Sequence, residues 1–172
     1  MTPHKKQSAA LALATAVTTL TLAGCSGKDP ASQPSITRQQ ALTHVYQILQ
    51  STGPLITPRP RLEPNKLLSE NGACPDEPDG MSDARVQVSR SYFLQGVPKQ
   101  AHSSIAKQIQ HIWKAKGYRI YGTSHLDTAN PQVFADTTDG FLMALSTEGN
   151  GQLNIGATSP CVWPNGTPPP QH

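Results

Sequence analysis

The side chains best suited to chemistry in this sequence are its histidines, and their spacing forms no metal-binding or catalytic motif. His125 and Asp127 lie two residues apart in a polar segment and are the most suggestive pair. A zinc site needs three or four ligands at suitable spacing, and no His-Glu-x-x-His run or Cys/His cluster accompanies this pair. His102 and His111 fall on roughly opposite sides of one expected helix, so they cannot share a ligand. The sequence therefore predicts no metal site and no cofactor.

Covalent catalysis has no recognisable motif either. The segment nearest to a Gly-x-Ser-x-Gly nucleophile elbow is Gly122-Thr123-Ser124-His125, which does not match it. Glycine-rich phosphate loops are missing, and two carboxylates chosen freely from the chain are no indication of glycoside hydrolysis. We expect a non-enzymatic protein, with a small envelope hydrolase or metal-dependent enzyme as the alternative.

The chain begins with a segment that is typical of an exported protein. A basic head at residues 4–6 precedes an uncharged run at residues 8–23, and Leu22-Ala23-Gly24-Cys25 closes it. The run is shorter than the roughly 20 apolar residues of a spanning helix and fits a removable signal. The tetrapeptide resembles the lipobox of bacterial lipoprotein precursors. That resemblance implies a diacylglyceryl group on Cys25, cleavage just before it, and a lipid-anchored protein on the extracytoplasmic face of the cell membrane.

An ordinary signal peptide in which Cys25 falls at this position by accident is the alternative. In either case residues 1–24 are a signal segment that takes no part in the fold. Residues 25–35 are polar, contain two prolines and are expected to form a flexible tether.

The other two cysteines, Cys74 and Cys161, form an even remainder in an exported domain. Such a remainder predicts one disulfide, worth about 4 kcal/mol for a long loop in the chain-entropy description. Two unpaired thiols, or one reactive cysteine beside a histidine, are the alternative.

Net charge excludes one class of partner. The whole chain carries +3, but from Cys25 onward 12 Lys and Arg face 11 Asp and Glu, which leaves +1. A nucleic-acid-binding domain is expected to keep a strong basic excess, so we expect no nucleic-acid partner.

The expected elements are two helices and a set of short strands. Thr37 and Gln40 fit a capping box, and apolar residues at three-and-four spacing then predict a helix over 37–51. A second helix is predicted over 98–116, with an apolar stripe that ends at Trp113. Period-two patterns and glycine turns predict strands at 84–94, 118–123, 132–136, 141–146 and 152–158.

Together these elements predict one α+β domain at residues 36–163. Their order, α-β-α-β-β-β-β, fits two layers: a mainly antiparallel sheet of about five strands with both helices on one face. The six prolines within residues 54–83 argue against a helix or a central strand there, and the acidic turn at residues 76–83 is expected to be a solvated loop. Residues 164–172 are expected to form a frayed, Pro-rich tail.

Beyond the lipobox the chain resembles small actinobacterial lipoproteins of unknown function. The resemblance rests on a helix, a cysteine in a loop, a Trp-bearing helix that ends at Gly117-Tyr118, a strand meander and a closing Ser159-Pro160-Cys161. It implies a globular extracytoplasmic domain and carries over no catalytic residue.

Charge is unevenly distributed along the chain. Seven bases and no acid lie between Arg85 and Arg119, whereas four acids and no Lys or Arg follow Leu126. One interpretation is that these bases face the acidic hairpins or are simply solvated. The other is that a lysine stripe of Lys99, Lys107 and Lys114 contacts anionic headgroups or wall polymers, at about 1 kcal/mol per base.

We therefore expect a membrane-anchored interaction or binding domain with an unidentified envelope partner or ligand. A carrier of a hydrophobic ligand held between sheet and helices is a further alternative. A carrier or an enzyme predicts a sizeable pocket with convergent polar groups, whereas an interaction domain predicts a filled core and an exposed patch.

Overall fold

A computed structural model of the 172-residue chain describes residues 36–69, 71–74 and 85–167. The predictions for the signal segment, Cys25, the tether at 25–35 and the acidic turn at 76–83 lie outside these residues.

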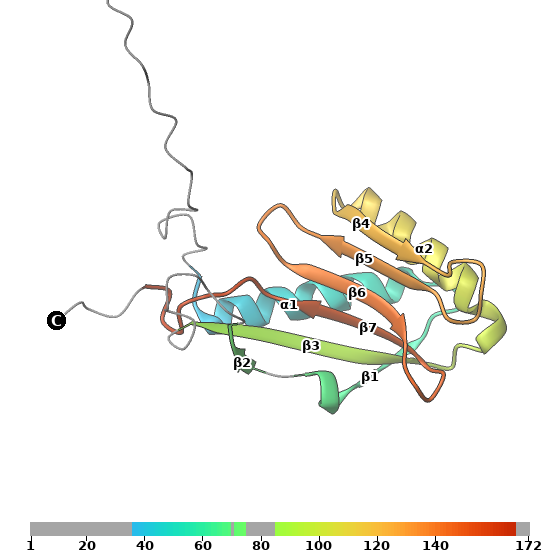
Figure 1. Ribbon diagram of the computed structural model, residues 1–172, viewed down its shortest axis with the longest axis horizontal. Coiled ribbons are helices and arrows are strands. Elements are labelled where there is room, and N and C mark those ends of the chain that lie inside the picture. The colour runs from blue at the N-terminus through green and yellow to red at the C-terminus, as the bar shows by residue number, and fades with distance from the viewer. Residues whose placement is uncertain (1–35, 70, 75–84, 168–172) are drawn as a thin grey trace, which may run out of the picture.

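The centre of the fold is a seven-stranded antiparallel sheet (Figure 1). Six strands follow one another in the order β1-β3-β7-β6-β5-β4, and β2 pairs with β3 beside β1. The strands span Arg61–Pro64 (β1), Asn71–Ala73 (β2), Val86–Gln95 (β3), Arg119–Ser124 (β4), Gln132–Asp136 (β5), Leu142–Thr147 (β6) and Leu153–Thr158 (β7). The meander β4-β5-β6-β7 is as predicted, and its hairpins turn at Gly140 and Gly151, which both have the positive φ that glycine adopts without strain.

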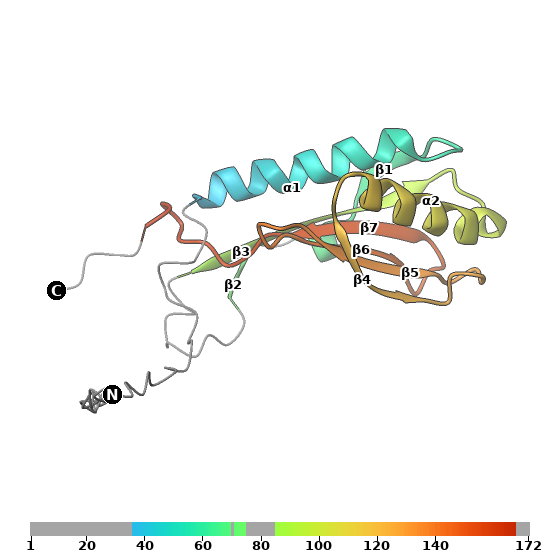
Figure 2. The ribbon, with the colours of Figure 1, turned by 90° about the horizontal axis from the view of Figure 1, so that it is seen from above.

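Two helices cover one face of this sheet (Figure 2). Helix α1, Arg38–Thr52, begins with the predicted capping box, in which Thr37 and Gln40 each satisfy a backbone donor of the other. Helix α2, His102–Ala115, follows the 3₁₀ turn η5 at Lys99–Ala101. Helix α1 packs on β3 and β7, and α2 packs on β4 and β5. The predicted α+β class with both helices on one face is confirmed.

The layer between sheet and helices is filled with side chains. Val88, Tyr92 and Leu94 of β3 point toward α1, and the apolar stripe of α2 belongs to the same buried cluster. Trp113 is completely buried, and its Nε1 donates to the Thr52 hydroxyl at 3.4 Å. A fully buried side chain of this kind contributes about 1.5–3 kcal/mol, so this contiguous cluster is the main source of stability.

The structure adds two strands to the prediction. Residues 54–83 contain β1 and β2, which both pair with the outer edge of β3. Pro64 ends β1 at the edge of the sheet, the one place where a missing N–H is tolerated in a ladder. The count of about five strands was therefore low, because short Pro-bearing edge strands lack a period-two pattern.

The disulfide is as predicted. Cys74 and Cys161 are bonded, with their Cα atoms 5.8 Å apart and a sequence separation of 87. Cys74 directly follows β2, so the bond fastens this edge of the sheet to the segment after β7.

The first residues of the expected tail are held in place. The Pro164 carbonyl accepts a hydrogen bond from the Arg38 backbone N–H at 3.2 Å, and Gly166 is buried. The prediction of fraying was therefore wrong for residues 164–166, because this segment covers the start of α1.

Candidate functional site

The face of the sheet opposite the helices carries a trough. Its volume is about 630 Å³. Side chains alternate along each strand, so the residues between the buried positions of β3, β5, β6 and β7 point to this side. From this side of β3 the trough is lined by the small, uncharged Ser89 and Ser91.

Strand register explains why the face is hollow. One row of paired residues crosses four strands, from Phe134 of β5 through Ala144 of β6 and Gly156 of β7 to Ser91 of β3. Its two inner members, Ala144 and Gly156, have almost no side chain, and Ser91 at the β3 end has a small one. The larger residues therefore stand at the ends and form walls.

Both walls of the trough are apolar and exposed. At one end, Tyr121 and Phe134 stack with ring centroids 6.1 Å apart. At the other, the 3₁₀ turn η3 (Lys66–Leu68) presents Leu67 and Leu68, which are 85% and 46% exposed. Leu142 borders the trough on β6 at 43% exposure. Of the six exposed large hydrophobic residues in the described part of the chain, four line this trough.

A β-bulge places Tyr121 on this face. The register between β4 and β5 shifts between Ile120 and Gly122, so the alternation of β4 is interrupted there. A Cβ at position 122 would lie 3.3 Å from Phe134 Cδ2, closer than such contacts usually are. Glycine at this position leaves the aromatic ring in place.

The floor of the trough contains a buried polar network. Asn154 Oδ1 accepts from the Ser91 hydroxyl at 2.6 Å and from Asn65 Nδ2 at 3.3 Å. Asn65 Oδ1 in turn accepts from the Leu67 backbone N–H at 3.2 Å. All three side chains are buried, so the network ties the leucine wall to β3 and β7.

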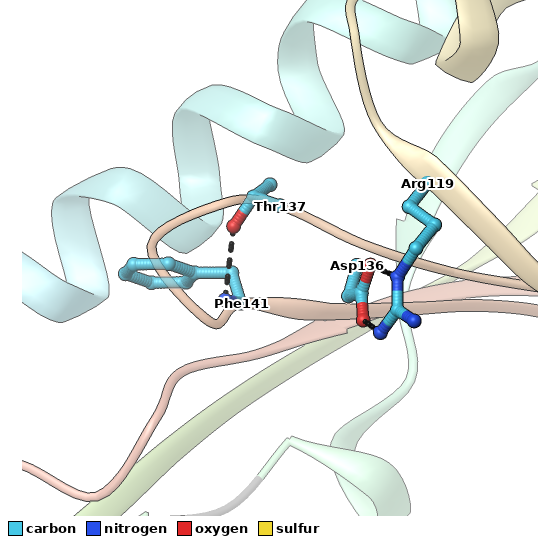
Figure 3. A network of polar contacts seen from close by, with 4 residues as sticks. All are labelled: Arg119, Asp136, Thr137 and Phe141. Carbon is cyan, nitrogen blue, oxygen red and sulfur yellow. Dashed lines mark hydrogen bonds and ion pairs between the residues drawn. The ribbon is translucent and has the colours of Figure 1, made fainter.

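An ion pair lies beside the aromatic end, at the start of β4 and the end of β5 (Figure 3). Arg119 donates to both carboxylate oxygens of Asp136, with Nε to Oδ1 at 3.0 Å. These hydrogen bonds lower the pKa of Asp136 and raise the pKa of Arg119. The following turn closes through Thr137, whose hydroxyl accepts from the Phe141 backbone N–H at 2.9 Å.

The lysine stripe is exposed, and two of its members have close neighbours. Lys107 Nζ lies 2.6 Å from Asp127 Oδ1, and Lys99 reaches the hairpin at Gly151. Lys114 makes no ion pair with any described residue and lies on the outer surface of α2. For Lys107, as for Arg119, the structure favours the interpretation that bases face acidic loops.

The histidines do not converge in the part of the chain that the structure describes. His125 has a left-handed backbone with φ of 53°, and Asp127 turns to Lys107 instead. His102 is buried and donates from Nδ1 to the Ala129 carbonyl at 2.8 Å, because a carbonyl can only accept. Across residues 36–69, 71–74 and 85–167, no group of three His, Cys, Asp or Glu side chains could hold a metal ion.

The trough was not found by sequence reasoning. The sequence feature that indicates the trough is the set of small, uncharged residues at alternate positions of β3 and β7. Their meaning depends on β3 lying beside β7, a pairing of segments more than 60 residues apart.

Within the described ranges, no helix has the length and apolarity needed to cross a membrane. The chain matches no protein-family model, no curated protein and no solved structure.

Proposed function

We propose that this protein is a membrane-anchored, extracytoplasmic lipoprotein whose folded domain binds a partner or ligand in the trough on the open face of its sheet. The supporting observation is the gathering of Tyr121, Leu142, Leu67 and Leu68 around a floor of small, uncharged residues. Depletion of charge with exposed aromatic and aliphatic residues is the composition of an interface centre. Solitary exposed apolar residues are ordinary, whereas a cluster of them usually marks a contact surface.

A non-enzymatic role fits this site better than catalysis. The polar groups of the floor are amides and hydroxyls that bond to one another, and the described residues that line the trough include no acid–base pair. A carrier that holds its ligand between sheet and helices fits poorly, because that layer is a contiguous cluster of buried side chains.

The anchor rests on the lipobox resemblance at Cys25, and the lysine stripe has a secondary role in this proposal. Lys114, with Lys99 and Lys107 beside it, would orient the domain toward anionic headgroups. The test for the stripe is binding to anionic vesicles after all three lysines are changed to Gln. A domain that binds anionic vesicles no better than neutral ones would remove the stripe from the proposal.

A single-cysteine accessibility experiment tests the location and the trough together. If Cys25 carries lipid and Cys74 is bonded to Cys161, an introduced cysteine is the only thiol in the protein. Leu142→Cys places it in the trough, and Leu55→Cys places it on the helix side at a residue that is 55% exposed. Both variants are treated with a membrane-impermeant maleimide, on intact cells and after purification.

We expect Leu55→Cys to react on intact cells, since the domain lies outside the membrane. Leu142→Cys should react several-fold more slowly on cells than after purification, because the trough is occupied in its native setting. A Leu55→Cys protein that reacts only after the cells are opened contradicts the location. Equal rates for Leu142→Cys in both settings contradict binding in the trough.

A further inference from the structure

The floor of the trough contains one polar side-chain group with no hydrogen-bond partner among the described residues. Asn154 is 5% exposed, and its Oδ1 already accepts two hydrogen bonds, from Ser91 and from Asn65. Its Nδ2 makes no hydrogen bond to any described residue, yet it is not among the polar atoms sealed from solvent. Asn154 lines the trough, so this amino group is a donor that the buried floor offers to a ligand, beside the exposed Tyr121 hydroxyl in the wall.

The orientation of the Asn154 amide follows from its neighbours. Asn65 Oδ1 accepts from the Leu67 backbone N–H, which can only donate, so Asn65 presents its Nδ2 to Asn154. Asn154 must therefore turn its oxygen toward Asn65, because two amino groups would repel each other. Its own Nδ2 points to the other side, away from Asn65.

Of the charged side chains that the structure describes, only Arg90 lines the trough. Arg90 contributes to the lining, but its guanidinium lies 5.8 Å from the centre of the Tyr46 ring on α1, on the opposite face of the sheet. Asp136 and Arg119 neutralise each other beside the aromatic end. A carboxylate or an ammonium group would lose its hydration here and gain no ion pair in return.

Shape favours an elongated apolar group. The hollow row crosses from β5 to β3, a distance of about 14 Å at the usual spacing of about 4.8 Å between strands. It runs between the Tyr121–Phe134 wall and the Leu67–Leu68 wall. Its volume of about 630 Å³ lies within the range of sites for small organic ligands.

We propose that the trough binds the acyl ester of a membrane lipid, with the chain along the hollow row and the ester carbonyl accepting a hydrogen bond from Asn154 Nδ2. This inference rests on the proposed function and specifies the ligand class for the same site. A protein segment as occupant is the outcome that would overturn it.

The test compares two ligands that differ only in the acceptor. Monooctanoylglycerol has an ester carbonyl, and 1-O-octylglycerol has the same chain and head without it. The full-length lipidated protein is placed in vesicles of dialkyl ether phosphatidylcholine, so the only competing acyl esters are those of its own anchor, which are the same for both ligands and all variants. A polarity-sensitive dye on Leu142→Cys reports binding, and the same dye on Leu55→Cys measures partition of the ligand into the vesicle.

We expect the ester to bind about fivefold more tightly than the ether, the ratio that corresponds to one net hydrogen bond. Asn154→Asp keeps an acceptor for Ser91 and Asn65 and replaces the amino donor with a carboxylate oxygen that repels the ester carbonyl, so it should abolish the preference for the ester. Asn150→Ala, in the exposed β6–β7 hairpin outside the trough, should keep that preference.

The inference would be overturned if ester and ether bound equally well to the protein with Asn154 intact, or if the dye on Leu142→Cys gave no response. Neither outcome depends on whether the Asn154 variant folds. The proposed function is judged separately by the protection of Leu142→Cys on cells. Protection without an ester preference would mean that a different occupant fills the trough.

Discussion

The two faces of the sheet use the same strands for different purposes. On the helix side of β3, Val88, Tyr92 and Leu94 are buried beneath α1. On the other side, Ser89 and Ser91 form part of an open trough. The helix face derives its stability from area removed from water, whereas the open face leaves its large apolar residues exposed at the walls.

This contrast shows where the domain can be altered. Substitutions on the helix face act on a packed cluster, where a lost side chain leaves a cavity. Substitutions on the walls of the trough change side chains that stay largely exposed in the folded protein. Stability and binding should therefore respond to different residues of the same strands.

The largest separation is expected between two aromatic residues. Trp113→Ala should lower the free energy of unfolding by about 3–5 kcal/mol, because it opens a cavity beneath α1 and removes the partner of Thr52. Tyr121→Ala, its matched control at 51% exposure, should cost less than about 1 kcal/mol. Urea unfolding followed by circular dichroism measures both. Similar losses for the two variants would show that the open face also belongs to the core.

Removal of the disulfide should have the next largest effect. Cys74→Ala combined with Cys161→Ala should cost about 2–4 kcal/mol, because the reduced chain gains freedom over an 87-residue loop. Thermal unfolding of the unsubstituted protein with and without a reducing agent is a second measurement of the same effect. A melting temperature that is insensitive to both treatments would contradict a structural role for this bond.

The polar floor of the trough should contribute less. Asn65→Ala leaves the Leu67 backbone N–H and one side of Asn154 without their partner, which should cost about 1–3 kcal/mol. Asn150→Ala in the exposed β6–β7 hairpin is the control and should stay within about 0.5 kcal/mol. If both variants unfold at the same urea concentration, the hydrogen bonds of Asn65 do not stabilise the turn that carries Leu67 and Leu68.

The smallest effect concerns pH. Arg119 lowers the pKa of Asp136 in the folded state relative to 3.8 in the unfolded chain. The ion pair therefore adds stability above the unfolded pKa, and this contribution is lost as pH falls through the folded pKa. Asp136→Asn should reduce the loss of stability between pH 7 and strongly acidic pH, as measured by urea midpoints. In 1 M salt the difference in pH dependence between Asp136→Asn and the unsubstituted protein should shrink, because exposed charges are screened. If Asp136→Asn leaves the pH dependence of the urea midpoint unchanged, the Arg119–Asp136 ion pair does not contribute to stability.

Local patterns predicted the elements well. The capping box at Thr37 and Gln40 placed the start of α1 within a residue, because both partners lie within one turn. The two cysteines predicted the disulfide, since only one pair remains once Cys25 is assigned to lipid. The lipid itself stays a prediction.

Long-range pairing accounts for what was not predicted. Strands β1 and β2 form only because β3 offers its outer edge, and their own sequences show no alternation. The trough requires Ala144, Gly156 and Ser91 to meet in one row, and no single strand contains that information. The wall residue Leu67 lies in the Pro-bearing segment at 54–83, for which neither a helix nor a central strand was predicted, and its side chain faces solvent.

The most direct test of the account is photo-crosslinking in living cells. The photoreactive amino acid p-benzoylphenylalanine replaces Tyr121 in the trough wall or Leu55 on the helix side, two residues of similar exposure at 51% and 55%. We predict several-fold more adduct at position 121 than at position 55, with a single class of partner identified by mass. Equal, low yields at the two positions would contradict the claim that the open face of the sheet is the binding face.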